Sequence, residues 1–148
     1  MAIAIGCDEA GFELKETLKR MLQEGGHAVE DFGTYDTKPV LYPDIAFSAA
    51  QSIVEGRNDR AVLICGTGIG MAISANKVPG IRAAQAHDTY SAERARKSND
   101  AQVITLGARV IGPELAKSIL QAWLASEFEP ERSGPKVERI KAFEAAGR

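Results

Sequence analysis

The residues best suited to chemistry lie in one short run, Cys65-Gly-Thr-Gly-Ile-Gly70. An apolar run at 61–64 precedes it and is typical of a strand buried on both faces of a parallel sheet. Helix-compatible residues follow from Met71 onward. Glycines let the backbone turn sharply, and a helix N-terminus directs N–H groups to the same place. The pattern predicts a strand–turn–helix anion site with Cys65 and Thr67 at its edge.

Three known motifs fail on this run. A Walker loop needs Gly-Lys-Ser/Thr, whereas the chain has Gly70-Met71. A dinucleotide fingerprint needs its third glycine at position 71, and a cysteine phosphatase needs an arginine there. Two interpretations stay open on spacing alone: a reactive cysteine beside backbone donors, or a tight turn with an inert buried cysteine.

Composition excludes several classes of protein. The 148 residues favour one domain, 1–148, and the net charge of −2 without a basic stripe argues against nucleic acid as a partner. No apolar run is long enough to cross a bilayer, and no signal-like N-terminal segment is present. Cys7 and Cys65 have no paired spacing, which fits a reducing compartment, so we expect a cytoplasmic protein without membrane contact.

Strand-like and helix-like segments alternate along the chain. Strands are expected at 3–6, 28–32, 61–64, 80–86 and 103–106; helices at 12–24, 43–55, from 71, at 89–98, from 113 and at 136–146, with a polar break at 130–135. In the helix from 113, the side chains expected to face inward are Leu115, Ile119, Leu120, Trp123 and Leu124. Asp88 is placed to cap the helix that follows it.

This alternation predicts a Rossmann-like three-layer α/β/α sandwich with a five-stranded parallel sheet. Ligands of such sheets bind outside the carboxyl ends of the strands. Asp8, Cys65, Thr67, His87 and Arg109 all follow predicted strands. The last helix comes after a Gly/Pro break, so it is a candidate for packing across a dimer.

Eight runs of residues resemble the ribose-5-phosphate isomerase B and galactose-6-phosphate isomerase family, nearly from end to end. They are Gly6-Cys-Asp8, Asp31-Phe-Gly-Thr-Tyr35, Tyr42-Pro43, Ile64-Cys-Gly-Thr-Gly-Ile-Gly70, Ala75-Asn-Lys77, Gly80-Ile-Arg82, Ser98-Asn-Asp100 and Gly107-Ala-Arg-Val-Ile-Gly112. The resemblance implies an aldose–ketose isomerase of phosphorylated sugars that uses neither metal nor organic cofactor. It also implies a homodimer or homotetramer whose active sites are shared between subunits.

The residues suit that chemistry, in which a proton moves between C1 and C2 through a cis-enediolate. A Cys65 thiolate beside a helix N-terminus is a plausible base. The loop residues Gly66, Gly68, Ile69, Gly70 and Met71 would contact the substrate. The N–H groups of 68–71 would hold the enediolate oxygen, and Thr67 would move the proton between the two oxygens.

Other roles follow from the resemblance alone. It implies that Asp8 and Asn99 bind sugar hydroxyls and that Tyr42 borders the sugar. It places Arg109, Arg132 and Lys136 on the phosphate. Without the resemblance, Arg132 and Lys136 would be charged residues of a solvated face.

Three positions depart from the family pattern: Glu9 and Ser98 each replace a usual histidine, and Lys136 a usual arginine. Serine cannot open a furanose ring as the histidine at position 98 would. One explanation is that His87 takes over ring opening, although a histidine at a helix entry also occurs without any catalytic part. The other is that the substrate, a tetrose 4-phosphate, forms no furanose ring.

The resemblance implies the conversion of ribose 5-phosphate to ribulose 5-phosphate as the expected reaction. The alternatives are a tetrose 4-phosphate of the erythrulose 4-phosphate type and a hexose 6-phosphate of the galactose or allose type. A different class also fits: a module that binds sugar phosphates without turnover, for which Glu9 and Ser98 would be lost catalytic groups. A nucleotide-dependent redox domain has only the fold class in its favour.

Overall fold

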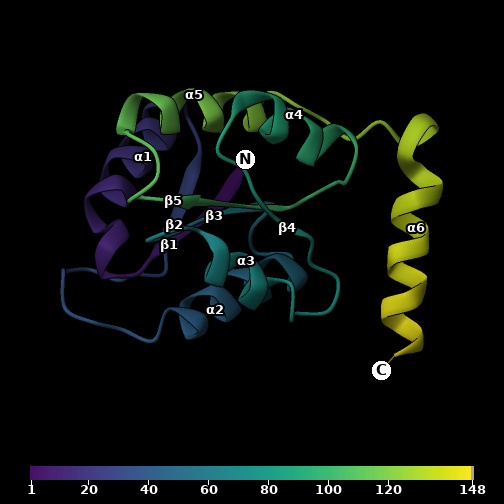
Figure 1. The fold of residues 1–148 in the computed structure, drawn as a ribbon, viewed down its shortest axis with the longest axis horizontal. Coiled ribbons are helices and arrows are strands. Elements are labelled where there is room, and N and C mark those ends of the chain that lie inside the picture. Colours follow the sequence, from purple (N-terminus) through teal and green to yellow (C-terminus); the bar gives the residue numbers. More distant parts are fainter. Residues whose placement is uncertain (148) are drawn as a thin grey trace.

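Five parallel strands form one sheet in the computed structural model, which describes residues 1–147 (Figure 1). The strands are β1 (Ala2–Cys7), β2 (Ala28–Asp31), β3 (Arg60–Cys65), β4 (Ala83–Gln85) and β5 (Val103–Gly107). Their spatial order is β2-β1-β3-β5-β4, and every neighbouring pair is parallel. The strand order reverses between β1 and β3, and such a switch point is where open α/β sheets bind ligands.

Helices cover both faces of the sheet. They are a 3-10 turn, η1 (Glu9–Gly11), and the α-helices α1 (Phe12–Glu24), α2 (Tyr42–Val54), α3 (Ile69–Ala75), α4 (Thr89–Lys97), α5 (Pro113–Leu124) and α6 (Pro130–Ala146). Figure 1 shows α1, α4 and α5 on one face, with α2 and α3 on the other. The expected Rossmann-like α/β/α sandwich with a five-stranded parallel sheet is thus confirmed.

The central strand β3 explains why the sheet needs both layers. All six of its residues are buried. Val62 and Ile64 pack with the side chains of α1, α4 and α5, whereas Leu63 and Cys65 pack with those of α2 and α3. Burying a large aliphatic side chain contributes about 1.5–3 kcal/mol, so β3 holds the two layers together and fixes the position of Cys65 at its end.

Two expectations at the level of elements are wrong in detail. The strand expected at 80–86 is only Ala83–Gln85, because Gly80 has a positive φ of 90° and Ile81 N–H closes a turn on the Val78 carbonyl. Leu115, expected to face inward, is 44% exposed. The buried face of α5 consists of Ala116, Ile119, Leu120 and Trp123.

The polar break expected at 130–135 is also wrong, because α6 is helical from Pro130 onward with Pro135 inside it. Proline suits the first helical position, where its missing N–H would have no partner. The Glu129 carbonyl accepts from Ser133 N–H at 3.1 Å, and Ser133 and Val137 are buried. Packing of these two residues outweighs the single helical bond that Pro135 removes.

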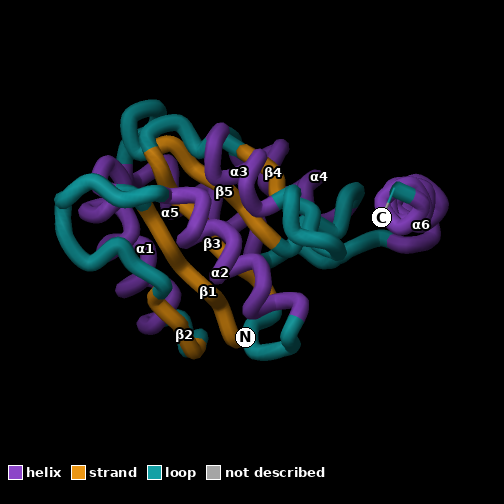
Figure 2. Tube along the Cα trace, turned by 90° about the horizontal axis from the view of Figure 1, so that it is seen from below, coloured by secondary structure: helices purple, strands orange, loops and turns teal. Residues whose placement is uncertain are grey.

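Helix α6 belongs to neither layer and stands beside the sheet, as both views show (Figures 1 and 2). It is attached near both ends: Glu129 N–H donates to the Lys97 carbonyl, and Gly80 N–H donates to Glu144 Oε2, each at 3.0 Å. These attachments fix α6 along the side of the sheet where strands β4 and β5 begin.

Candidate active site

Cys65 is the last residue of β3, and its sulfur is held by the turn that follows. Gly68 adopts a left-handed φ of 80°, which turns its N–H toward Cys65 Sγ at 3.1 Å. The next amide, of Ile69, donates to Thr67 Oγ1 at 3.2 Å. Cys65 is 5% exposed, whereas Thr67 beside it in the loop is exposed.

The other cysteine is a different kind of thiol. Cys7 ends β1 and is fully buried, and burial raises the pKa of its thiol to about 12 although Lys15 acts in the opposite direction. Both cysteines are free. Cys65 has a backbone N–H donor on its sulfur, whereas the Cys7 sulfur faces the Thr34 carbonyl at 3.9 Å.

Helix α3 begins at Ile69, so the amides of Gly70 and Met71 have no acceptor in a preceding helical turn. The side chain of Tyr42, from the first turn of α2, lies directly against Gly70. A Cβ at position 70 would overlap with the hydroxyl and ring of Tyr42. The glycine therefore brings a phenol next to the start of α3.

Asp8 and Arg109 occupy the neighbouring strand ends. Asp8 Oδ1 accepts from the amides of Ala10 and Gly11 at 2.9 and 3.1 Å. Arg109 N–H donates to the Gly66 carbonyl at 3.0 Å, and its guanidinium lies over Gly66. Burial raises the pKa of the Asp8 carboxyl, and the charge of Arg109 is among the groups that offset part of this shift.

His87 lies at the same edge of the sheet, two residues beyond β4. Gly107 N–H donates to His87 Nε2 at 2.9 Å, so a neutral ring must carry its proton on Nδ1. Gly107 is the register partner of Cys65 across β3 and β5. The structure thus brings together at the carboxyl edge of the sheet Asp8, Tyr42, Cys65, Gly66, Thr67, Gly68, Ile69, Gly70, Met71, His87 and Arg109.

The remaining predicted site residues lie at the amino edge of the sheet. Ser98 and Asn99 follow α4, where Arg94 Nε donates to Ser98 Oγ at 2.8 Å and Arg82 Nε donates to the Asn99 carbonyl at 2.9 Å. Arg132 and Lys136 are exposed on α6, four residues apart and hence on one helical face. A strand of five or six residues spans roughly 17–20 Å, so one chain does not unite the two groups.

Two polar residues near the loop, Gln85 and Thr105, escaped sequence reasoning, whereas Glu9 was already singled out there. Gln85 Nε2 donates to the Thr67 carbonyl at 2.7 Å, and Thr105 Oγ1 donates to the Gly68 carbonyl at 2.8 Å. Glu9 Oε2 accepts from Val40 N–H at 3.3 Å. Thr105 had a signal, a hydroxyl inside an otherwise apolar strand, because a buried polar group needs a partner.

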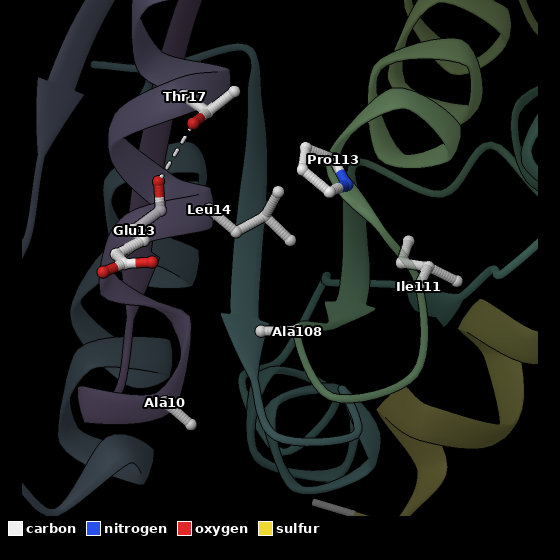
Figure 3. A pocket seen from close by; sticks show the side chains of 7 residues that line it. All are labelled: Ala10, Glu13, Leu14, Thr17, Ala108, Ile111 and Pro113. Carbon is white, nitrogen blue, oxygen red and sulfur yellow. Dashed lines mark hydrogen bonds between the residues drawn. The ribbon is translucent and has the colours of Figure 1, made fainter.

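A cavity of about 230 Å³ lies beside this edge, between the start of α1 and the β5–α5 loop (Figure 3). Its lining is Ala10, Glu13, Leu14, Thr17, Ala108, Ile111 and Pro113. It adjoins Asp8 and Arg109 in sequence but does not include Cys65. Within residues 1–147, no group of three or more His, Cys, Asp or Glu side chains is arranged to hold a metal, and no helix could span a membrane.

Comparison with known proteins places this architecture. The family described as Ribose/Galactose Isomerase matches residues 3–140. The D-erythrulose-4-phosphate isomerase of Pectobacterium atrosepticum is 58% identical, over 97% of this chain and 95% of that protein. A ribose-5-P isomerase B of Listeria innocua is 55% identical over the full length of both chains. The solved ribose-5-phosphate isomerase B of Clostridium thermocellum superposes with a TM-score of 0.98 at 42% identity, covering all of both chains.

The fold and the thiol-bearing loop therefore define an α/β protein of the sugar-phosphate isomerase class. The chain belongs to the ribose/galactose isomerase family. The family membership that the sequence motifs predicted is confirmed by this match.

Proposed function

We propose that the protein is an aldose–ketose isomerase of sugar phosphates in which Cys65 is the base. The observation that carries this proposal is the 3.1 Å hydrogen bond from Gly68 N–H to Cys65 Sγ, at the carboxyl edge of the sheet. An N–H donor favours the thiolate, and a thiolate can accept a carbon-bound proton. The names of the relatives, all isomerases, support the same reaction.

In the proposed reaction the Cys65 sulfur takes the proton from C2 of the aldose. The C–H electron pair forms the C1–C2 double bond, and negative charge moves to O1. The amides of Gly70 and Met71 hold that oxygen, since those of Gly68 and Ile69 already serve Cys65 and Thr67. Thr67 relays a proton from O2 to O1, and Cys65 returns its proton to C1, which gives the ketose.

Asp8, Tyr42 and Arg109 surround this centre. In the proposal Asp8 binds a sugar hydroxyl and Tyr42 borders the carbon chain beside Gly70. Arg109 is exposed over Gly66 and supplies positive charge for the phosphate.

We further propose that the working form is a homodimer, or a homotetramer built from dimers, with shared active sites. In one chain Cys65 lies at one edge of the sheet, while Asn99, Arg132 and Lys136 lie at the opposite edge. A partner subunit whose amino edge faces this carboxyl edge supplies the missing hydroxyl-binding and phosphate-binding groups. In this proposal the chain is one domain, 1–148, and works in the cytoplasm, consistent with its two free cysteines.

The contacts of Ser98 and His87 favour an open-chain substrate. Ser98 Oγ is engaged by Arg94, and His87 Nε2 by the Gly107 amide, so only His87 Nδ1 is left for ring opening. A tetrose 4-phosphate forms no furanose ring and needs no such acid. Ribose 5-phosphate is the second candidate, supported by the name of the Listeria relative, and hexose 6-phosphates come third.

The test is an isomerisation screen in D₂O over tetrose 4-phosphates, ribose 5-phosphate, allose 6-phosphate and galactose 6-phosphate. Turnover should convert the aldose to the ketose, and solvent deuterium should appear on the substrate carbon to the extent that the Cys65 thiol exchanges with solvent before it returns its proton. Cys65→Ser should lose at least about 100-fold in rate while still binding substrate, whereas Cys7→Ala should keep turnover. Wild-type protein that binds these sugars but neither isomerises them nor exchanges their carbon-bound protons would instead be a binding module. Unchanged ribose 5-phosphate turnover in His87→Ala would exclude a ring-opening role for His87.

A further inference from the structure

Side chains from strands β4 and β5 contact the backbone of the loop from Cys65 to Gly70 and fix the direction of its amides. Two peptide units are involved, Thr67–Gly68 and Gly68–Ile69. Both are trans, because the one cis bond of residues 1–147 joins Gly33 and Thr34. In a trans peptide the carbonyl and the N–H point in opposite directions. A group that fixes the carbonyl of such a unit therefore also fixes where its N–H points.

The first unit is held by Gln85. Its Nε2 donates to the Thr67 carbonyl at 2.7 Å, and the N–H of the same unit, on Gly68, donates to Cys65 Sγ at 3.1 Å. The second unit is held by Thr105 together with the Ala72 amide of α3, which also donates to the Gly68 carbonyl, at 3.1 Å. Thr105 Oγ1 donates to the Gly68 carbonyl at 2.8 Å, and the N–H of that unit, on Ile69, donates to Thr67 Oγ1 at 3.2 Å.

Gln85 and Thr105 are themselves register partners, paired across the parallel strands β4 and β5. Thr105 is fully buried, so its hydroxyl must find an acceptor, and the one it has is the loop carbonyl. The end of β5 also touches the loop, since a Cβ on Gly107 would come within 2.8 Å of the Thr67 backbone. Gly107 N–H in turn donates to His87 Nε2, which holds this end of β5 in place.

We propose that Gln85 and Thr105 are positioning residues of the isomerase, which aim the Gly68 N–H at the Cys65 sulfur and the Ile69 N–H at the Thr67 hydroxyl. They touch neither sulfur nor substrate and act through the peptide planes of the loop. This inference rests on the proposed function for its kinetic consequence, but the orientation of the amide on Cys65 is independent of any substrate.

The variants are Gln85→Leu, Gln85→Glu and Thr105→Val. Gln85→Leu removes the donor, and Gln85→Glu keeps the shape but sets a carboxylate against a carbonyl. Thr105→Val removes the hydroxyl at nearly constant volume. Thr105→Ser keeps the hydroxyl and removes only the methyl group. Matched controls are Gln102→Leu and Ser126→Ala. Gln102→Leu loses two 2.8 Å bonds, one to the Gly80 carbonyl and one from the Arg82 amide, and Ser126→Ala loses a 2.7 Å bond to the Ala122 carbonyl.

The first measurement is the rate of Cys65 alkylation by iodoacetamide at one neutral pH, followed by mass spectrometry of the Cys65 peptide. Gln85→Leu and Thr105→Val should change this rate about 10-fold, because the sulfur loses an aligned N–H donor. Gln85→Glu should change it at least as far. Thr105→Ser and both controls should keep the wild-type rate.

The second measurement is steady-state kinetics on the substrate found in the screen. The three variants should lose about 10–100-fold in kcat with little change in KM, because misdirected amides act on the transition state. Ser126→Ala should cost similar stability to Thr105→Val without the loss in kcat. If Thr105→Val does not fold, the exposed Gln85 still decides the question.

A Gln85→Leu variant that keeps both the alkylation rate and the kcat of the wild-type protein would overturn the inference. If the wild-type protein turns over no sugar phosphate, the proposed isomerase function fails, yet the alkylation rates still support or overturn the role of Gln85 and Thr105. The two failures are therefore distinguishable.

Discussion

At the scale of single residues, the contact between Tyr42 and Gly70 joins parts of the chain that are distant in sequence. Tyr42 opens α2, whereas Gly70 lies in the first turn of α3. The tyrosine side chain fills the space that any side chain at position 70 would need. Gly70 has no positive φ, so its backbone would accept alanine, and the contact with Tyr42 is what opposes one.

We predict that Gly70→Ala lowers kcat/KM about 10–100-fold, because the new methyl group displaces Tyr42 from the start of α3. Steady-state kinetics of Gly70→Ala, Tyr42→Ala and the double variant measure the coupling. The double variant should resemble Tyr42→Ala, since the methyl group then has room. Gly112→Ala is the matched control, because a Cβ there meets nothing within 4 Å. Additive losses would contradict the steric explanation.

At the scale of elements, a buried lysine ties α1 to β2 and to the turn after it. Lys15 Nζ lies 2.8 Å from Asp31 Oδ2 and donates to the Thr34 carbonyl at 2.7 Å, with none of its side chain exposed. Lys19 reaches the same carboxylate at 3.0 Å from a partly exposed position. This arrangement anchors the segment that runs from β2 toward Tyr42.

Lys15→Met should lower the free energy of unfolding by about 3–5 kcal/mol, because it removes one partner of a buried ion pair. Lys19→Met is the matched control and should cost about 0–1 kcal/mol, because its pair is screened by solvent. Urea unfolding at neutral pH measures both. Equal losses in the free energy of unfolding would show that burial does not increase the contribution of the Lys15 ion pair to stability.

The same cluster predicts a pH dependence of stability. Burial alone would raise the pKa of Asp31, but hydrogen bonds from Lys15, the Gly33 amide and Lys19 outweigh it and lower the pKa below its ordinary value. Below pH about 4 the unfolded chain then binds more protons than the folded one, so stability is lost as pH falls through the folded pKa. Urea unfolding between pH 2.5 and 6, roughly the range in which carboxylates titrate, should show a shallower acid loss for Asp31→Asn than for wild type.

At the scale of the whole molecule, the predicted substrate groups are divided between two edges of one sheet. Cys65 and its neighbours lie at the carboxyl edge, and Arg132 and Lys136 lie on α6, attached at the amino edge by Glu129 and Glu144. Both views show α6 beside the sheet and apart from the helices that cover its two faces (Figures 1 and 2). A complete site of the proposed kind needs two copies of the chain.

Subunit mixing tests this arrangement. Cys65→Ser and Arg132→Ala should each be nearly inactive alone, but refolding them together should restore about a quarter of wild-type activity. Half of the random dimers are then mixed, and each mixed dimer has one site with both halves intact. Refolding each variant alone is the control. A mixture no more active than its components would show that sites are not shared.

The sequence by itself determined the sheet, its two helical layers and the loop at Cys65, because apolar periodicity and glycine spacing act over a few neighbouring residues. It also placed Asp8, Thr67, His87 and Arg109 at the carboxyl edge, since parallel strands end at one edge. The division of the other site residues to the opposite edge, the helical state of 130–135, the burial of Lys15 and the supports from Gln85 and Thr105 were decided by tertiary structure alone. Each depends on contacts between segments distant in sequence, where packing outweighs local preference.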